Sequence, residues 1–105
     1  MDRIRQLEKF LEEDPDDPFN TYALALEYIK VDKQKAHALF DKLLHHHPDY
    51  LPAYYTYAQF LIDSSESQKA GPVLQKGVEI ARRVNDAKAL KELNNAYSNW
   101  LFEQS

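Results

Sequence analysis

The chain has 105 residues, of which 44% are hydrophobic and 29% charged, and this length and composition predict a single globular domain. Its formal net charge of −4 counts against binding to nucleic acid, because a basic surface supplies most of that affinity. The chain contains no cysteine, which excludes disulfides and thiolate zinc sites, and only 2 glycines, which favours helices.

The spacing of apolar residues predicts five to six helices, and no segment alternates apolar and polar residues long enough to be a strand. The first helix is expected over 2–13, and the proline-containing turn 14–18 ends it. Its apolar stripe consists of Ile4, Leu7, Phe10 and Leu11. The second is expected over 18–31, with Asp17 as its N-cap. It is apolar on more than one face, so we expect it to lie between two neighbours.

The third and fourth helices are expected in the middle of the chain. The third covers about 33–46 and is capped by Asp32, and the fourth covers about 50–62. The fourth is rich in tyrosine and contains Tyr50, Tyr54, Tyr55 and Tyr57. A polar turn over 63–67 follows it.

Two more helices are expected after this turn. Ser65, with a glutamine three residues later, has the spacing of a capping box and predicts a helix over about 65–84. Pro72 lies near its start, so either the helix begins later or Pro72 kinks it. Residues 85–86 are expected to cap a last helix over 87–102. Its apolar stripe consists of Leu90, Leu93, Ala96, Tyr97, Trp100 and Leu101.

The sequence contains an internal repeat. Pro15 and Pro48 each close a turn, and they are 33 residues apart. Other pairs recur after 33 or 34 residues, namely Ala25 and Ala58, Tyr28 and Leu61, Ala36 and Ala70, and Phe40 and Leu74. A period of this length is typical of stacked two-helix repeats. Small residues at repeated positions let helix backbones approach closely, so that successive hairpins interlock.

In these positions the chain resembles the tetratricopeptide repeat family. The matching residues are Thr21, Leu24, Ala25, Tyr28, Ala36, Phe40, Leu43 and Pro48 in one repeat, and Tyr54, Tyr57, Ala58, Leu61, Ala70, Leu74, Gly77 and Arg82 in the next. Thr21 and Tyr57 depart from the family's pattern. Arg82 replaces the turn proline, which leaves open where the helix before the last one ends.

The resemblance implies an all-α fold of antiparallel helical hairpins, stacked as a short right-handed α-solenoid. One domain would cover residues 1–105. Its parts would be an N-terminal half-repeat helix over 1–15, repeats over 18–50 and 51–84, and a C-terminal capping helix over 86–103.

The resemblance also implies a protein–protein interaction scaffold, which binds a peptide or a partner helix in a concave groove lined by the first helices of the repeats. The contact residues at the matching positions would be Phe19, Tyr22, Leu26, Ile29, Lys30, Tyr55, Gln59, Ile62, Lys91 and Asn95. The other interpretation of Tyr22, Leu26 and Tyr55 is that they pack in the core. The family's lysine and asparagine clamp for carboxylates is not expected, because only Lys91 and Asn95 keep its spacing.

The sequence points to no enzyme, cofactor or metal site. It lacks a glycine-rich phosphate loop, a serine elbow and an HExxH motif. Consecutive helical residues point about 100° apart, so the histidines at 45–47 cannot converge on one ion and are interpreted as a polar helix end. Because neither a signal peptide nor a long apolar run is recognisable, we expect a cytoplasmic protein without a membrane partner.

The last helix leaves two interpretations open. Trp100 and Phe102 either cap the end of the helical stack or form an association surface. The second interpretation gives the alternative function, a structural module that forms a weak homo-oligomer through its C-terminal aromatic helix.

Overall fold

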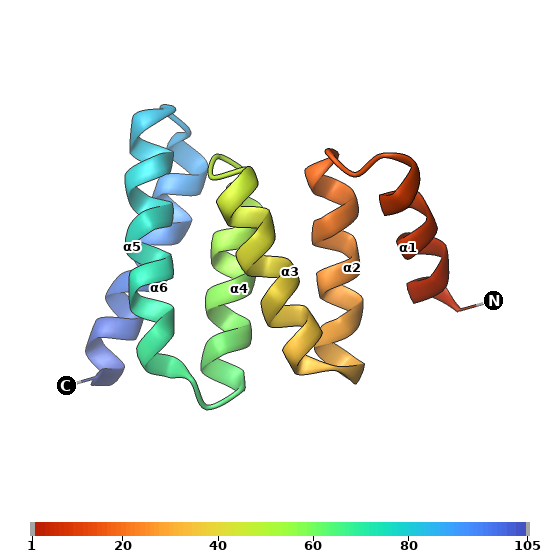
Figure 1. Cartoon of the computed structure of the whole chain (residues 1–105). Coiled ribbons are helices and arrows are strands. Elements are labelled where there is room, and N and C mark those ends of the chain that lie inside the picture. The colour runs from red at the N-terminus through yellow and green to blue at the C-terminus, as the bar shows by residue number, and fades with distance from the viewer. Residues whose placement is uncertain (1, 105) are drawn as a thin grey trace. The chain divides into compact units, whose positions relative to one another are not determined.

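A computed structural model of the chain describes residues 2–104, and over this range it consists of six helices joined by short turns (Figure 1). The helices are α1 (Arg3–Glu13), α2 (Pro18–Val31), α3 (Lys33–His46), α4 (Pro52–Asp63), α5 (Ser67–Arg83) and α6 (Ala87–Gln104). No strand occurs between residues 2 and 104, so the predicted all-α class is confirmed. None of these helices combines the length and apolarity needed to cross a membrane.

The helices divide into two compact units. The first, Met1–Pro48, contains α1 to α3, and the second, Asp49–Ser105, contains α4 to α6. The single domain expected over residues 1–105 stays a prediction, because each unit is compact on its own.

In the first unit, α2 packs against both α1 and α3, as its two apolar faces predict. Asp17 caps α2, since its carboxylate accepts a hydrogen bond of 3.0 Å from the Phe19 N–H. Asp32 alone joins α2 to α3. Its backbone N–H donates to the Tyr28 carbonyl at 2.8 Å, and its carboxylate accepts from the Lys35 N–H at 3.3 Å. These side-chain caps are the predicted ones, and they turn α2 and α3 into an antiparallel hairpin.

Tyr28 connects the three helices of this unit. Its ring is buried on α2, and its hydroxyl donates a hydrogen bond of 2.9 Å to the Glu8 carboxylate on α1. The Lys35 ammonium of α3 lies 5.3 Å from the centre of the ring. The hydrogen bond to Glu8 raises the pKa of Tyr28, because ionisation would remove the donated proton, and burial raises it further.

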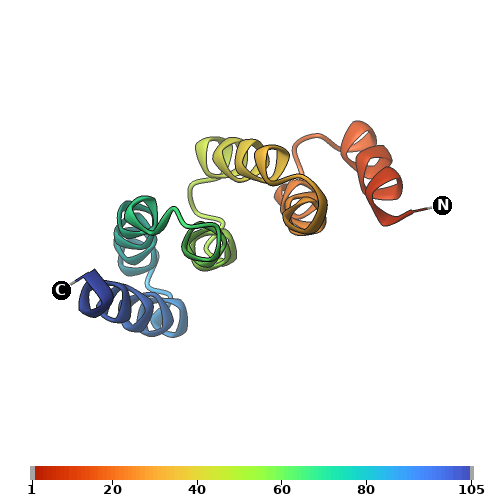
Figure 2. The ribbon, with the colours of Figure 1, turned by 90° about the horizontal axis from the view of Figure 1, so that it is seen from below.

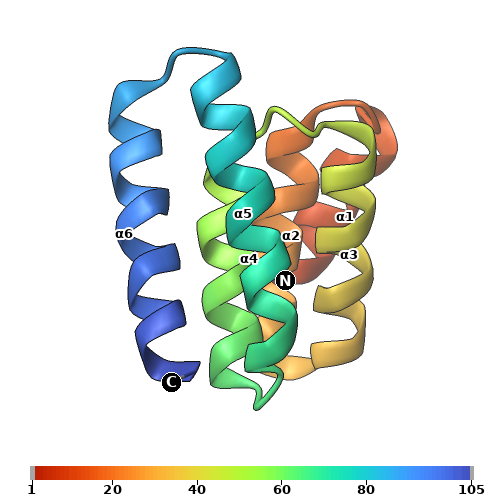
Figure 3. The ribbon, with the colours of Figure 1, turned by 90° about the vertical axis from the view of Figure 1, so that its left-hand side faces the viewer.

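In the second unit, α4 and α5 form an antiparallel hairpin, and α6 folds back along α5 (Figures 2 and 3). Tyr54, Tyr57, Ala58 and Leu61, which match the repeat pattern of the family, are all buried in the core. A Cβ atom added at Gly77 would lie 2.9 Å from Tyr54 Cβ. The absence of a side chain at this position therefore lets α5 approach α4 closely.

The two turns of this unit have the same geometry. Ser65 and Asn85 adopt positive φ values of 63° and 61°. The next N–H in each turn, from Glu66 or Asp86, donates to a carbonyl five residues earlier at 2.8 Å and 3.0 Å. This is the Schellman motif, in which the backbone itself ends the helix. The predicted capping box at Ser65 is therefore wrong, since Glu66 occupies the N-cap of α5.

Other boundaries differ from the expectation by a few residues. Helix α4 begins at Pro52 rather than near residue 50, because proline suits the first helical position. Pro72 lies inside α5, so the helix does not begin after it. The sequence left open where α5 ends, because Arg82 replaces the family's turn proline. In the structure the helix ends at Arg83.

Two residues of the predicted apolar stripes are exposed. Phe10 has 43% of its surface exposed and Leu101 has 46%. Each lies on a helix at one end of its unit, where one face of the helix has no neighbouring helix within that unit. The apolar stripes therefore extend beyond the part of each helix that another helix covers.

We expect Tyr28→Phe to lower the free energy of unfolding by about 1 kcal/mol near neutral pH, because it removes the hydrogen bond to Glu8 and keeps the ring. The folded pKa of Tyr28 is the higher one, so this contribution is complete below the unfolded pKa of about 10 and is lost as the pH rises through the folded value. Urea titrations of both proteins across this range measure the difference.

A difference in stability that stays constant into alkaline solution would contradict this role of the hydrogen bond. Tyr55→Phe is the matched control. The side chain of Tyr55 is 50% exposed, and its hydroxyl has no hydrogen bond within residues 2–104. Tyr55→Phe should therefore leave the free energy of unfolding unchanged at every pH.

Candidate functional site

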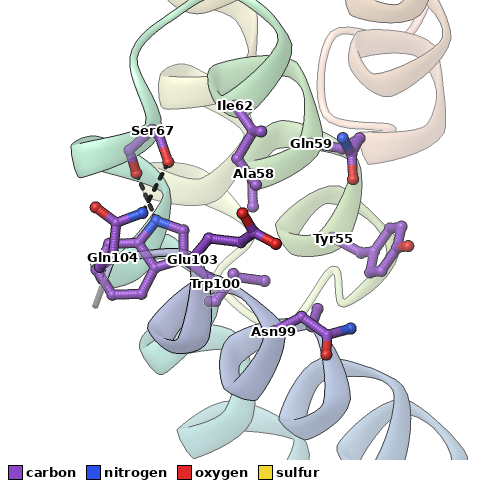
Figure 4. A pocket seen from close by; sticks show the side chains of 11 residues that line it. Tyr55, Ala58, Gln59, Ile62, Ser67, Asn99, Trp100, Glu103 and Gln104 are labelled. Atoms are coloured by element: carbon purple, nitrogen blue, oxygen red, sulfur yellow. Dashed lines mark hydrogen bonds between the residues drawn. The ribbon is translucent and has the colours of Figure 1, made fainter.

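A pocket of about 510 Å³ opens between α4 and α6, and α5 closes its base (Figure 4). Ligand pockets commonly have volumes of about 300 to 1,000 Å³. The lining residues of α4 and α5 are Tyr55, Ala58, Gln59, Ile62, Ser67 and Leu74, and those of α6 are Ala96, Asn99, Trp100, Glu103 and Gln104. All of them belong to the second compact unit, so this unit alone forms the pocket.

Trp100 holds α6 against α5 at the base of the pocket. Its Nε1 donates a hydrogen bond of 2.7 Å to the Ser67 carbonyl (Figure 4). Its ring lies directly over Gly71, where an added Cβ atom would overlap the indole. The Tyr97 ring stacks on the indole, with the two ring centres 5.9 Å apart. Trp100 thus packs into the helical stack, whereas Phe102 is 79% exposed.

The polar side chains of the pocket differ in how they are held. Gln59 Nε2 donates a hydrogen bond of 3.0 Å to Asp63 at the end of α4. Gln104 Nε2 donates one of 3.3 Å to the Ser67 hydroxyl. Asn99 and Glu103 have no hydrogen bond or ion pair within residues 2–104. Their side chains can therefore interact with a molecule that enters the pocket.

Three of the predicted contact residues lie together in this pocket. Tyr55, Gln59 and Ile62 are exposed along one face of α4 and line it. Lys91 and Asn95 are exposed on α6 but do not line it. Lys91 precedes Trp100 by nine residues, so on a helix the two side chains point in opposite directions.

The other predicted contact residues lie on α2, in the first unit. Phe19 and Lys30 are exposed, and Tyr22, Leu26 and Ile29 are partly buried. Helical spacing places all five on one face of α2. The alternative interpretation of Tyr22, Leu26 and Tyr55 was that they pack in the core. None of the three is fully buried.

The five lining residues of α6 were not predicted as contacts, namely Ala96, Asn99, Trp100, Glu103 and Gln104. They are spaced by three, one, three and one residues, the pattern of a single helix face. This spacing was visible in the sequence. Which face of α6 turns toward α4 was not, because it depends on how Trp100 docks onto α5.

Between residues 2 and 104, no three or more histidine, aspartate or glutamate side chains are grouped closely enough to hold a metal ion. In the histidine run, His46 Nδ1 lies 2.9 Å from the Lys42 carbonyl, one turn earlier on α3. A carbonyl can only accept, so the ring nitrogen is the donor in this contact.

Comparisons with known proteins give one consistent result. A family model described as tetratricopeptide repeat matches residues 32–93. The chain is similar to a solution NMR structure of a tetratricopeptide repeat domain protein from Salinibacter ruber, with 36% identity, a TM-score of 0.76, and coverage of 83% of this chain and 89% of that one. A crystal structure of a tetratricopeptide repeat domain protein from Salinibacter ruber gives 35% identity, a TM-score of 0.71, and coverage of 80% and 96%. No curated protein matches the chain.

We expect Gly71→Ala to lower the free energy of unfolding by about 1 kcal/mol, because the overlap with the Trp100 ring outweighs the helix propensity gained. In a Trp100→Leu background the same change should instead raise stability, by up to about 1 kcal/mol. Urea unfolding of the four proteins, followed by circular dichroism, completes this double-mutant cycle. Equal effects in the two backgrounds would contradict the contact.

Proposed function

Because the chain belongs to the tetratricopeptide repeat family, we propose that it is a protein–protein interaction scaffold that binds a segment of a partner protein between α4 and α6. Domains of this family are generally protein–protein interaction modules. The proposed role is not enzymatic, and its location is the cytoplasm. Nucleic acid is not the proposed partner, since the net charge is −4.

The observation that carries this proposal is the exposure of apolar and aromatic groups inside a formed pocket. Tyr55 is 50% exposed and Ile62 is 37% exposed, and both line it. Exposed aromatic side chains in a concave site are typical of binding surfaces, because they bury a large area with few rotatable bonds.

The pocket is built on rigid elements. Its residues come from three helices, and the packing of Trp100 over Gly71 fixes α6 in place. A partner segment would therefore meet side chains that are already positioned, which keeps the entropy lost on binding small.

The remaining predicted contacts form part of this proposal. Lys91 and Asn95 would contact portions of the partner that extend beyond the pocket. The exposed face of α2, which includes Phe19 and Lys30, would provide a separate contact area in the first unit.

A second candidate function is self-association through α6. It is favoured by Phe102, which is 79% exposed near the end of this helix and does not line the pocket. An exposed aromatic side chain of this kind is suited to an interface with a second copy of the chain.

We expect Tyr55→Ala to weaken partner binding about tenfold or more, because truncation of a central interface tyrosine commonly costs at least about 1.4 kcal/mol. Phe102→Ala is the matched control, since it removes an exposed aromatic residue of the same helical unit from outside the pocket. Quantitative pull-downs from lysate of the source organism with wild type and both variants make the measurement.

The two candidate functions predict opposite results. Loss of a partner with Tyr55→Ala and retention with Phe102→Ala supports the pocket. Unchanged recovery with Tyr55→Ala removes the pocket from the proposal. Sedimentation at several concentrations decides the alternative, since a monomer at all of them excludes self-association.

A further inference from the structure

We propose that the pocket between α4 and α6 selects a partner segment that inserts an arginine side chain next to an apolar residue. This inference rests on the proposed function and specifies its ligand. It follows from the position of one carboxylate, the helix ends around it and the surfaces beside it.

Glu103 supplies the charge of the pocket. In the view of Figure 4, its carboxylate points from α6 toward α4. No lysine, arginine or histidine lines the pocket, and Glu103 forms no ion pair within residues 2–104. A cation that entered would have this carboxylate as a partner without displacing another positive group.

The helix termini strengthen the preference for a cation. Helices α4 and α6 run in the same direction and both end beside the pocket (Figure 3). The C-terminal end of a helix carries a partial negative charge, which basic residues in the last turn usually offset. Neither helix has a basic residue there, and α4 ends with Asp63.

A basic residue that is close in sequence to the pocket residue Ser67 already has a partner. Lys69, in the first turn of α5, forms an ion pair of 3.0 Å with Glu66. Lys91 lies twelve residues before Glu103, which is about 18 Å along a helix at 1.5 Å per residue. The N-terminal end of α5 at Ser67, which also lines the pocket, carries a partial positive charge, so two negative helix ends and one positive end surround the full negative charge of Glu103.

The uncharged groups favour arginine over lysine. The Tyr55 ring offers an aromatic face, and Asn99 offers an amide oxygen. A guanidinium group is planar, stacks on aromatic rings and donates several hydrogen bonds in one plane, whereas an ammonium group is a compact point charge. Ala58 and Ile62 form the apolar part beside these groups, where a neighbouring apolar side chain would fit.

The contribution of the ion pair between Glu103 and the partner's arginine to affinity depends on how far water is excluded from it. Glu103 is exposed, so a simple surface ion pair would change affinity less than about fivefold. A bound segment excludes water from the carboxylate, and close charge pairs inside an interface are worth more than exposed ones. We therefore expect replacement of the arginine by uncharged citrulline to weaken binding about tenfold.

A phage-displayed library of random peptides, selected on the full chain, tests this inference. Peptides selected by the wild type should be enriched in arginine beside an apolar residue. Selection on Glu103→Lys should lose this enrichment and favour glutamate. Glu79→Lys is the control, because it makes the same change in net charge on α5, outside the pocket, and it should keep the arginine preference.

Each outcome decides the inference. Selected peptides that need Tyr55 but show no preference for arginine would leave the proposed function standing and overturn the arginine pocket. A library that yields no peptide would count against both. If the wild type self-associates and Glu103→Lys does not, the occupant is a second copy of the chain, and the inference about a foreign segment is wrong.

Discussion

The close approach of helices over residues with little or no side chain is the constraint on which this structure depends. Ala25 and Ala36 are fully buried in the first unit, and Ala58 and Ala70 are buried at the equivalent positions of the second. A larger side chain at any of them would have to be accommodated by moving a helix, since protein interiors contain few voids. The same constraint acts at the pocket. Only a residue without Cβ at position 71 lets the Trp100 ring of α6 lie against α5.

Much of the fold could be predicted because the repeat places chemically similar residues at similar positions. The offset of 33 between Pro15 and Pro48 predicted where the hairpins end, and the aspartate caps predicted where helices begin. Ser65 was misinterpreted because its positive φ comes from a backbone motif that does not require a characteristic side chain at this position. The exposure of Phe10 could not be predicted, because an apolar spacing shows a face of a helix without showing whether another helix covers it.

The candidate site could be predicted on α4 and not on α6. Tyr55, Gln59 and Ile62 were separated from the core tyrosines by their positions in the repeat, and they do line the pocket. Glu103 and Asn99 escaped prediction because the rotation of α6 is set by a contact between Trp100 and Gly71, which are 29 residues apart. The same contact connects stability with function, since a change that displaces the indole from α5 also moves the residues that would meet a partner.

The central claim is that a partner segment binds between α4 and α6. The most direct test is an amide NMR map of the isotope-labelled chain, recorded with and without the partner recovered from lysate. Binding at this place should shift the amide signals along α4 and in the second half of α6, and the indole N–H signal of Trp100, the only tryptophan in the chain. Shifts confined to α1, α3 or the outer face of α5, with the indole signal unchanged, would contradict it.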